Sequence, residues 1–261
     1  MRRFRRIQVW GTLSVLALML VAGQNPPSVS QGFQPVAGPA PASMEIPVRL
    51  IAEARQSYQG VTDYTCLFVK QENLHGQLQP QNLINMWART KPFSVYMYWK
   101  KPNEGQEACY VAGRNNGMMR AHSTGLIGAV GFVSLDPSDP RCLENSRHPI
   151  TDAGVGRLIE RLADRWELEN RVNKTIVHIA EYDYDKRRCI RVDTLHPDNT
   201  GKEFLFYRTV VYFDKTTRLP IRLDNYDWPR PGGDPSGALM ESYSYAGLKL
   251  NVGVPDSIFD H

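Results

Sequence analysis

The sequence predicts an α+β protein, with one large curved antiparallel sheet of about ten strands and helices packed against one face. Short runs of β-branched and aromatic residues recur between residues 64 and 250, and Gly, Pro and Asn separate them. The runs fall into two groups, and an amphipathic helical pattern precedes each group. The 12 Tyr, 9 Phe and 5 Trp residues also favour strands over a helical bundle.

The N-terminus predicts export. Four arginines lie within residues 2–6, and residues 7–23 are almost wholly apolar, carry no ionisable side chain and end in small residues. This pattern is typical of a secretory signal peptide over residues 1–23, cut before Gln24. An uncleaved N-terminal anchor is the alternative, judged by the length of the apolar run. The expected location is the periplasm or the cell envelope.

Residues 24–44 are rich in Pro, Gly, Ser, Ala and Gln and predict a flexible tether, which leaves residues 45–261 as a single domain. The whole chain has 31 Lys plus Arg against 27 Asp plus Glu, a net charge of +4. Removing the four arginines of the signal brings the mature chain to 27 against 27. A neutral chain gives no support for a nucleic-acid partner.

The first helix is predicted over residues 46–58, where Val48, Leu50, Ile51, Ala54 and Tyr58 recur at helical intervals before a glycine. The first strands are predicted over residues 64–70, 83–89, 93–99 and 107–112. A tight turn at residues 115–117 then leads into residues 118–120. Residues 126–135 are apolar and spaced by glycines, and Asp-Pro turns follow them.

A second helix is expected after a cap at Thr151 or Asp152. Its buried stripe would contain Val155, Leu158, Ile159, Leu162 and Trp166. The second group of strands is predicted over residues 175–182, 189–195, 203–213, 219–226 and 239–250.

The strand at residues 93–99 is apolar or aromatic on both faces. One face carries Phe93, Val95, Met97 and Trp99, and the other carries Ser94, Tyr96 and Tyr98. A half-solvated antiparallel strand should instead alternate apolar with polar residues. Two interpretations follow: the protein packs its own core on both faces, or the helices cover one apolar face incompletely and leave room for a hydrophobic ligand.

The four cysteines, Cys66, Cys109, Cys142 and Cys189, allow two disulfides in three pairings in an exported chain. Alternatively, some are small buried hydrophobic residues. None has the CxxC spacing of a zinc or redox site, so neither a metal nor a cofactor is predicted.

No catalytic residue is predicted, because the chain has no serine-hydrolase elbow, zinc-protease motif or phosphate-binding glycine loop. The pairs Asp183 with Asp185 and Asp224 with Asp227 have the spacing of acid–base or calcium groups. Nearby Lys and Arg residues favour solvated or ion-paired turn residues instead.

Arg147 and His148 precede the second helix. They are either a polar latch that holds the helix over the sheet or turn residues that satisfy a backbone carbonyl.

Four segments resemble the bacterial family known as domain of unknown function 1571: residues 92–99 (PFSVYMYW), 146–151 (SRHPIT), 219–229 (LPIRLDNYDWP) and 241–251 (ESYSYAGLKLN). This resemblance covers most of residues 45–261 and implies no particular activity.

A second likeness concerns Tyr64-x-Cys66-x-Phe68-x-Lys70 and the strand that follows residues 91–92 and closes at Pro102. These residues are similar to the start of the periplasmic lipoprotein carrier LolA. The resemblance implies an unclosed half-barrel whose helices form a lid over an apolar cavity for acyl chains. It implies ligand-facing positions, together with the strand pattern above, at Tyr64, Phe68, Phe93, Val95, Met97 and Trp99.

The leading hypothesis is therefore a non-enzymatic carrier or receptor that binds a lipid or acyl chain, including the acyl chain of a lipoprotein. It would be a monomer that contacts a membrane surface and binds no nucleic acid. One alternative is a structural or interaction module of the cell envelope with a fully packed core. A hydrolase is the third reading, and it requires His148 and His196 to converge with a carboxylate.

Overall fold

The computed structural model describes residues 42–261, apart from the side chains of Leu126 and Ile127. The predicted signal peptide (residues 1–23) and residues 24–41 of the predicted tether lie outside the described residues. Ala42 pairs with Val177, and Met44 is buried in the core, so the last residues assigned to the tether belong to the folded domain.

The first half of the fold is α1 (Glu45–Tyr58) followed by the strands β1 (Asp63–Leu74), β2 (Gln77–Leu78), β3 (Asn82–Arg89), β4 (Ser94–Lys101), β5 (Glu107–Val111), β6 (Met119–His122) and β7 (Val133–Leu135). The short helical turns η1 (Asn115–Gly117) and α2 (Gly125–Gly128) flank β6. The turns α3 (Pro140–Leu143) and η2 (Ile150–Asp152) then lead to the second half.

The second half is α4 (Val155–Val172) followed by the strands β8 (Ile176–Tyr184), β9 (Arg187–Leu195), β10 (Arg208–Asp214), β11 (Pro220–Tyr226) and β12 (Leu239–Leu250). A last helical turn, η3 (Asp256–Phe259), lies near the end of the described chain.

The twelve strands of residues 42–261 form one antiparallel sheet in the order β7-β6-β5-β4-β3-β1-β12-β11-β10-β9-β8, with β2 paired to β1. The two groups of strands join where β1 pairs with β12, which places Phe68 opposite Tyr245. The strands at the two ends, β7 and β8, do not pair with each other, so the sheet is unclosed. Two short strands, β2 and β7, raise the number above the predicted ten because they are too brief to show alternation.

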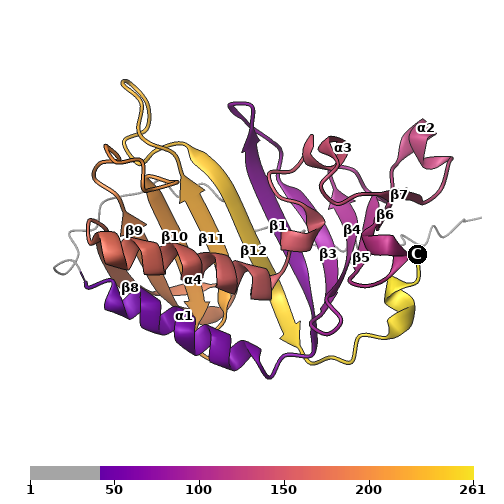
Figure 1. Cartoon of the computed structure of the whole chain (residues 1–261), viewed down its shortest axis with the longest axis horizontal. Helices are drawn as coiled ribbons and strands as arrows, with labels where there is room; N and C mark the ends of the chain where they lie inside the picture. Colours follow the sequence, from indigo (N-terminus) through magenta and orange to yellow (C-terminus); the bar gives the residue numbers. More distant parts are fainter. Residues whose placement is uncertain (1–41) are drawn as a thin grey trace, which may run out of the picture. The chain divides into compact units, whose positions relative to one another are not determined.

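Both long helices cover one face of the sheet, and Figure 1 shows α1 and α4 side by side across β8–β12. Arg55 of α1 forms an ion pair of 2.6 Å with Glu160 of α4. The predicted stripe of α4 is buried throughout. The α+β prediction, with an unclosed antiparallel sheet and helices on one face, is therefore confirmed.

The predicted helix cap at Thr151 or Asp152 is wrong. Residues 150–152 form a separate 3-10 turn, and α4 begins at Val155 with Gly154 as its cap. Gly154 has a φ of 101°, a conformation that favours glycine. The hydroxyl of Tyr64, which lies on β1, accepts a hydrogen bond of 3.0 Å from the backbone N–H of Val155. A residue of the sheet thus supplies the cap that local sequence suggested at Thr151.

The strand predicted over residues 203–213 is also shorter than expected, since β10 begins at Arg208. The side chain of Asn199 holds Phe204 through two hydrogen bonds of 2.9 Å to its backbone N–H and carbonyl. These bonds take the backbone groups that a ladder partner would otherwise use. Residues 203–207 therefore form a loop whose aromatic side chains turn inward.

The two faces of β4 contribute to two different cores. Val95 and Met97 belong to the main core beneath the helices, whereas Tyr96 packs on the other face against Cys109 and Phe259. The segment that ends the described chain, including η3, covers this second face. Packing within the protein thus accounts for the aromatic character of both faces without a ligand.

All four cysteines are free thiols, three of them buried and Cys142 partly exposed. This agrees with the interpretation of small buried hydrophobic residues, and burial raises the pKa of the Cys109 thiol to about 11. Across residues 42–261, no helix has the length and apolar character needed to cross a membrane.

Candidate functional site

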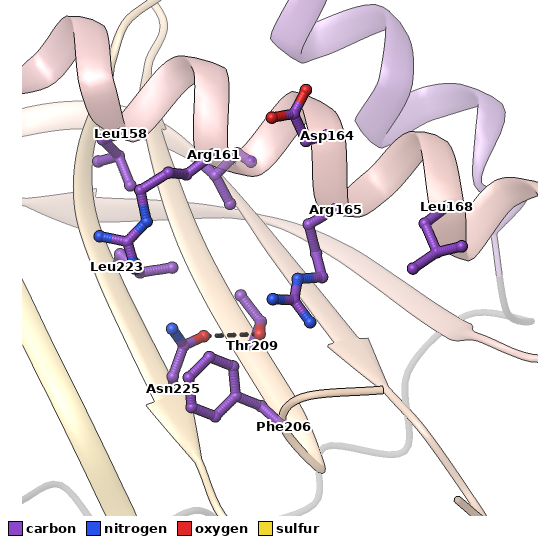
Figure 2. A pocket seen from close by; sticks show the side chains of 10 residues that line it. Leu158, Arg161, Asp164, Arg165, Leu168, Phe206, Thr209, Leu223 and Asn225 are labelled. Carbon is purple, nitrogen blue, oxygen red and sulfur yellow. Dashed lines mark hydrogen bonds between the residues drawn. The ribbon is translucent and has the colours of Figure 1, made fainter. Parts of the chain in front are cut away.

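A cavity of about 390 Å³ lies between α4 and the strands β10 and β11 (Figure 2). We call it the α4 pocket. Its lining consists of one side of α4, one residue of the loop before β10 and three residues of the sheet: Leu158, Arg161, Leu162, Asp164, Arg165, Leu168, Phe206, Thr209, Leu223 and Asn225.

Half of this lining is aliphatic or aromatic. Leu158 and Leu162 come from the buried stripe of α4, and Leu223 lies opposite them on β11. Phe206 comes from the inward-turned loop, and it is also buried. Leu168 is half-buried, on the last turns of the helix. The pocket therefore offers apolar surface from three separate parts of the chain.

The charged lining comes from Arg161 and Arg165, which lie on the same side of α4 because four residues separate them. Figure 2 shows both guanidinium groups directed from the helix toward the strands, whereas the carboxylate of Asp164 points away from them. On β10 and β11, the Thr209 hydroxyl donates a hydrogen bond of 2.6 Å to Asn225. The charges that face the pocket are thus positive.

Arg165 lies with its guanidinium carbon 6.0 Å from the centre of the Phe206 ring. Among residues 42–261, it forms neither a hydrogen bond nor an ion pair. Burial lowers the pKa of this guanidinium, and the carboxylate of Glu169 opposes the shift. Arginine nevertheless stays protonated in proteins, so the pocket contains an unpaired positive charge.

Arg161 belongs at the same time to a buried polar group around Glu241 of β12, which we call the Glu241 cluster. Glu241 accepts hydrogen bonds from Arg147 Nε (3.0 Å), His148 Nε2 (2.9 Å) and Asn225 Nδ2 (2.8 Å). Arg161 lies 3.7 Å from the same carboxylate and 3.1 Å from His148 Nε2. The cluster therefore joins α4 and the loop before it to the sheet at one edge of the α4 pocket.

Glu241 is completely buried and ionised. Burial alone would raise its pKa, but the hydrogen bond and charge of His148, the amide of Asn225 and the charge of Arg161 together lower the pKa to about 2. The partners of Glu241 thus outweigh the cost of removing it from water.

A second carboxylate, Glu72 of β1, holds the same loop. It accepts hydrogen bonds from Tyr243 Oη (2.5 Å), Lys70 Nζ (3.1 Å) and the backbone N–H of Arg147 (3.1 Å). Arg147 Nη1 also donates to the carbonyl of Asn73, at 3.2 Å. Both interpretations of Arg147 thus find support: it satisfies a carbonyl, and with His148 it fastens the loop before α4 to carboxylates of the sheet.

His196 lies elsewhere in the fold, with Nδ1 2.7 Å from the carbonyl of Phe206 and Nε2 3.3 Å from Glu169 of α4. His148 instead contacts Glu241, so the two histidines pair with different carboxylates. Within residues 42–261, no contact joins them. The arrangement that a hydrolase using both histidines requires is absent from the described part of the chain.

At least one aspartate of each pair is ion-paired, as the nearby basic residues suggest. Asp183 forms an ion pair of 3.0 Å with Arg188, and Asp224 forms one of 2.9 Å with Arg222. Residues 42–261 contain no group of three or more His, Cys, Asp or Glu side chains placed to hold a metal ion.

The six predicted ligand-facing residues lie in or against the main core. Tyr64, Phe68, Val95 and Met97 are buried there, and Phe93 and Trp99 pack against it while partly exposed. None of the six lines the α4 pocket or a second cavity of about 440 Å³ near η3. Their contact with a ligand stays a prediction.

The sequence does not predict Arg161, Arg165 or Phe206 as site residues. The local signal for the arginines is their position beside the apolar stripe of α4, at a spacing of one helical turn. Phe206 has no such signal, because its position depends on the loop held by Asn199. Leu158 and Leu162 were identified correctly as inward-facing residues, although not as the wall of a pocket.

The protein thus has an unclosed antiparallel sheet with two helices over one face. A partly apolar pocket lies between one of these helices, α4, and the sheet. Residues 61–261 match the model of a family described as protein of unknown function, DUF1571. The chain belongs to this family, as the four segments indicated. No curated protein matches it.

Several solved structures are similar in fold at low identity. A DUF1329 family protein from Desulfovibrio piger is 15% identical, with 85% of this chain and 98% of that chain covered and a TM-score of 0.41. The lipoprotein LppX from Mycobacterium tuberculosis is 10% identical, with coverages of 81% and 98% and a TM-score of 0.46. A LolA superfamily protein from Nitrosomonas europaea is 10% identical, with coverages of 84% and 97% and a TM-score of 0.31. Likeness at this level carries no argument about function.

Proposed function

We propose that this protein is a non-enzymatic carrier or receptor that binds a lipid or acyl chain in the α4 pocket. The supporting observation is a cavity of about 390 Å³ with five apolar side chains in its wall. Ligand pockets typically measure about 300–1,000 Å³ and are mostly apolar with a few polar groups. The α4 pocket falls within this volume range, and half of its lining residues are apolar.

An acyl chain fits the apolar part of the lining for a simple energetic reason. Each methylene group removed from water contributes about 0.8 kcal/mol, before the cost of ordering the chain. Leu158, Leu162 and Leu223 are already held by the core, so they need no reordering when a chain enters. Binding would therefore retain a large share of the gain from burial.

The proposal also includes export to the periplasm or cell envelope, since it depends on the signal predicted over residues 1–23. In that location a monomeric carrier would take its ligand from a membrane surface or from a lipoprotein. In a second form of the proposal, the core beneath β4 opens to admit a longer chain. That chain would then contact the six residues predicted to face a ligand: Tyr64, Phe68, Phe93, Val95, Met97 and Trp99.

A substitution that fills the pocket tests the proposal. Leu168→Trp places a larger side chain at a half-buried position of the lining and fills part of the pocket. We therefore expect about tenfold weaker binding of a fluorescent fatty acid. Leu78→Trp is the matched control, because Leu78 is exposed on β2 and should leave binding unchanged. Native mass spectrometry of the purified protein should also detect bound lipid.

The proposal fails if the wild-type protein carries no lipid and binds neither fatty acids nor fatty alcohols in titration. Val95→Glu is unsuitable as a test, because Val95 is fully buried in the core. An unpaired carboxylate at that position would unfold the protein whatever its function.

One observation favours a second candidate, a structural or interaction module of the cell envelope. Both faces of β4 are packed by the protein's own side chains, as expected of a fully packed core. This candidate predicts that the Leu168→Trp protein and the wild type behave alike toward every apolar ligand.

A further inference from the structure

We infer that the ligand of the α4 pocket carries a negatively charged headgroup, such as a carboxylate or phosphate diester, and that Arg165 binds this group. The inference rests on the proposed function and adds the chemistry of the headgroup. It depends on three features of the pocket: an unpaired cation, the local balance of charges and the direction of the side chains.

The unpaired cation is Arg165. Its guanidinium points toward Thr209 and Phe206, and none of its N–H groups has a hydrogen-bond partner among residues 42–261 (Figure 2). A partly buried guanidinium without an acceptor forgoes charge-assisted hydrogen bonds that an anion in the pocket would restore. Among residues 42–261, the only aromatic ring that Arg165 contacts is that of Phe206, at 6.0 Å.

The charges around the pocket leave a positive surplus. Arg147, Arg161 and Arg165 face two buried carboxylates, Glu241 and Glu169. Arg147 and Arg161 share Glu241, and the more distant Glu169 acts on Arg165 without forming an ion pair. Three positive charges against two negative charges leave a positive surplus, and the charge of His148 beside Glu241 adds to it, so the surroundings favour an anionic headgroup.

Other charged groups nearby do not change this balance. The Asp164 carboxylate points away from the strands (Figure 2), and Glu72 pairs with Lys70. His148 contacts Glu241, and His196 contacts Glu169, and neither side chain can add a negative charge to the surroundings. A cationic or neutral headgroup would leave Arg165 without a counter-charge.

The geometry also separates the two ends of the ligand. Arg165 lies between the apolar side chains of Leu162 and Leu168 along the helix, so an anion at Arg165 has aliphatic surface on both sides. The expected ligand is therefore an amphiphile, and not a small free anion.

Three ligands of equal chain length test the inference: laurate, lauryl alcohol and dodecyltrimethylammonium. Calorimetric titration should give the tightest binding for laurate and the weakest for the ammonium compound. Arg165→Gln should weaken laurate about tenfold and leave lauryl alcohol unchanged, because only the carboxylate loses a charge-assisted hydrogen bond. Arg165→Lys keeps the charge and should keep the preference for laurate.

Arg157→Gln is the matched control, since Arg157 is an exposed arginine on the same helix that does not line the pocket. Acetate has the carboxylate without the chain and should not displace laurate at equal concentration. Displacement by acetate would reveal a site for small free anions and overturn the inference.

Equal affinity for laurate and lauryl alcohol, or an equal loss of both in Arg165→Gln, would overturn the assignment of the headgroup and leave the proposed function standing. Failure of all three ligands to bind would instead contradict the proposed function, and this inference with it.

Discussion

At the scale of single residues, Glu241 shows how a buried charge is retained. It is fully buried, yet the hydrogen bonds from His148 and Asn225 and the nearby guanidinium of Arg161 hold its pKa at about 2, against an ordinary value of 4.5. Removing one partner from such a cluster leaves a buried charge without a counter-charge. The resulting loss of stability is usually larger than the net stabilisation that the intact cluster provides. The contacts that hold α4 and the loop before it on the sheet therefore depend on Glu241 staying ionised.

This pKa shift predicts a specific dependence of stability on pH. Because the folded pKa is lowered, the contribution of Glu241 is fully present above its ordinary pKa and is lost as the pH falls from about 4.5 toward about 2. Between about pH 5 and pH 3, wild type should lose about 2 kcal/mol more of its free energy of unfolding than Glu241→Gln does. Urea unfolding at the two pH values measures the difference.

Glu104→Gln is the control for that measurement, since Glu104 is exposed in the loop between β4 and β5. Between about pH 5 and pH 3, the Glu104→Gln protein should lose as much of its free energy of unfolding as the wild type does. Identical acid losses in wild type and Glu241→Gln would show that the Glu241 cluster does not hold the carboxylate ionised.

At the scale of elements, α4 is positioned by the sheet as much as by its own sequence. The helix supplies the buried stripe, but its start is fixed by Gly154 and by the hydroxyl of Tyr64. A Cβ atom at residue 154 would lie 2.5 Å from that hydroxyl, and the backbone φ of 101° is itself unfavourable for other residues.

Gly154→Ala should therefore lower the free energy of unfolding by more than about 1 kcal/mol. Gly117→Ala separates the two causes, because Gly117 also has a positive φ (77°) but has open space around its added Cβ. We expect a clearly smaller loss there, measured by urea unfolding. Equal losses in the two variants would mean that the contact with Tyr64 has no energetic weight.

At the scale of the whole described domain, one sheet carries both groups of strands. Where the two groups meet, the ring of Phe68 on β1 stacks with Tyr243 of β12 and makes a tilted contact with Tyr245 of the same strand. The main core extends across this junction, from Val95 on β4 to Val192 on β9. A shared core of this kind favours unfolding as one cooperative unit.

Tryptophan fluorescence and far-ultraviolet circular dichroism should therefore report the same urea transition. Phe68→Ala should shift both curves together, with a loss of about 3–5 kcal/mol. Leu78→Ala, at an exposed position of β2, should leave them in place. Two separated transitions would show that the groups of strands unfold independently.

Much of the fold was predictable because the relevant signals are local. The apolar stripe from Val155 to Trp166 follows the period of a helix, and the alternation at Phe93–Trp99 follows that of a strand, whatever lies nearby. The start of the strand predicted at residues 203–213 was wrong. The side chain of Asn199, which lies outside that segment, forms hydrogen bonds to the backbone N–H and carbonyl of Phe204. The α4 pocket was not predictable, since its walls come from a helix, a loop and two strands that only the fold brings together.

The sequence by itself determined the two long helices, most of the longer strands and which of their faces are apolar, because periodicity depends only on the backbone geometry of each segment. Only the tertiary structure decided how those apolar faces are used. It filled the face of β4 with the protein's own core and left space beside Arg165 on α4. It also brought His148 to Glu241, 93 residues later in the chain. Contacts between residues so far apart in the sequence depend on the order of the strands in the sheet. Local sequence patterns do not predict that order.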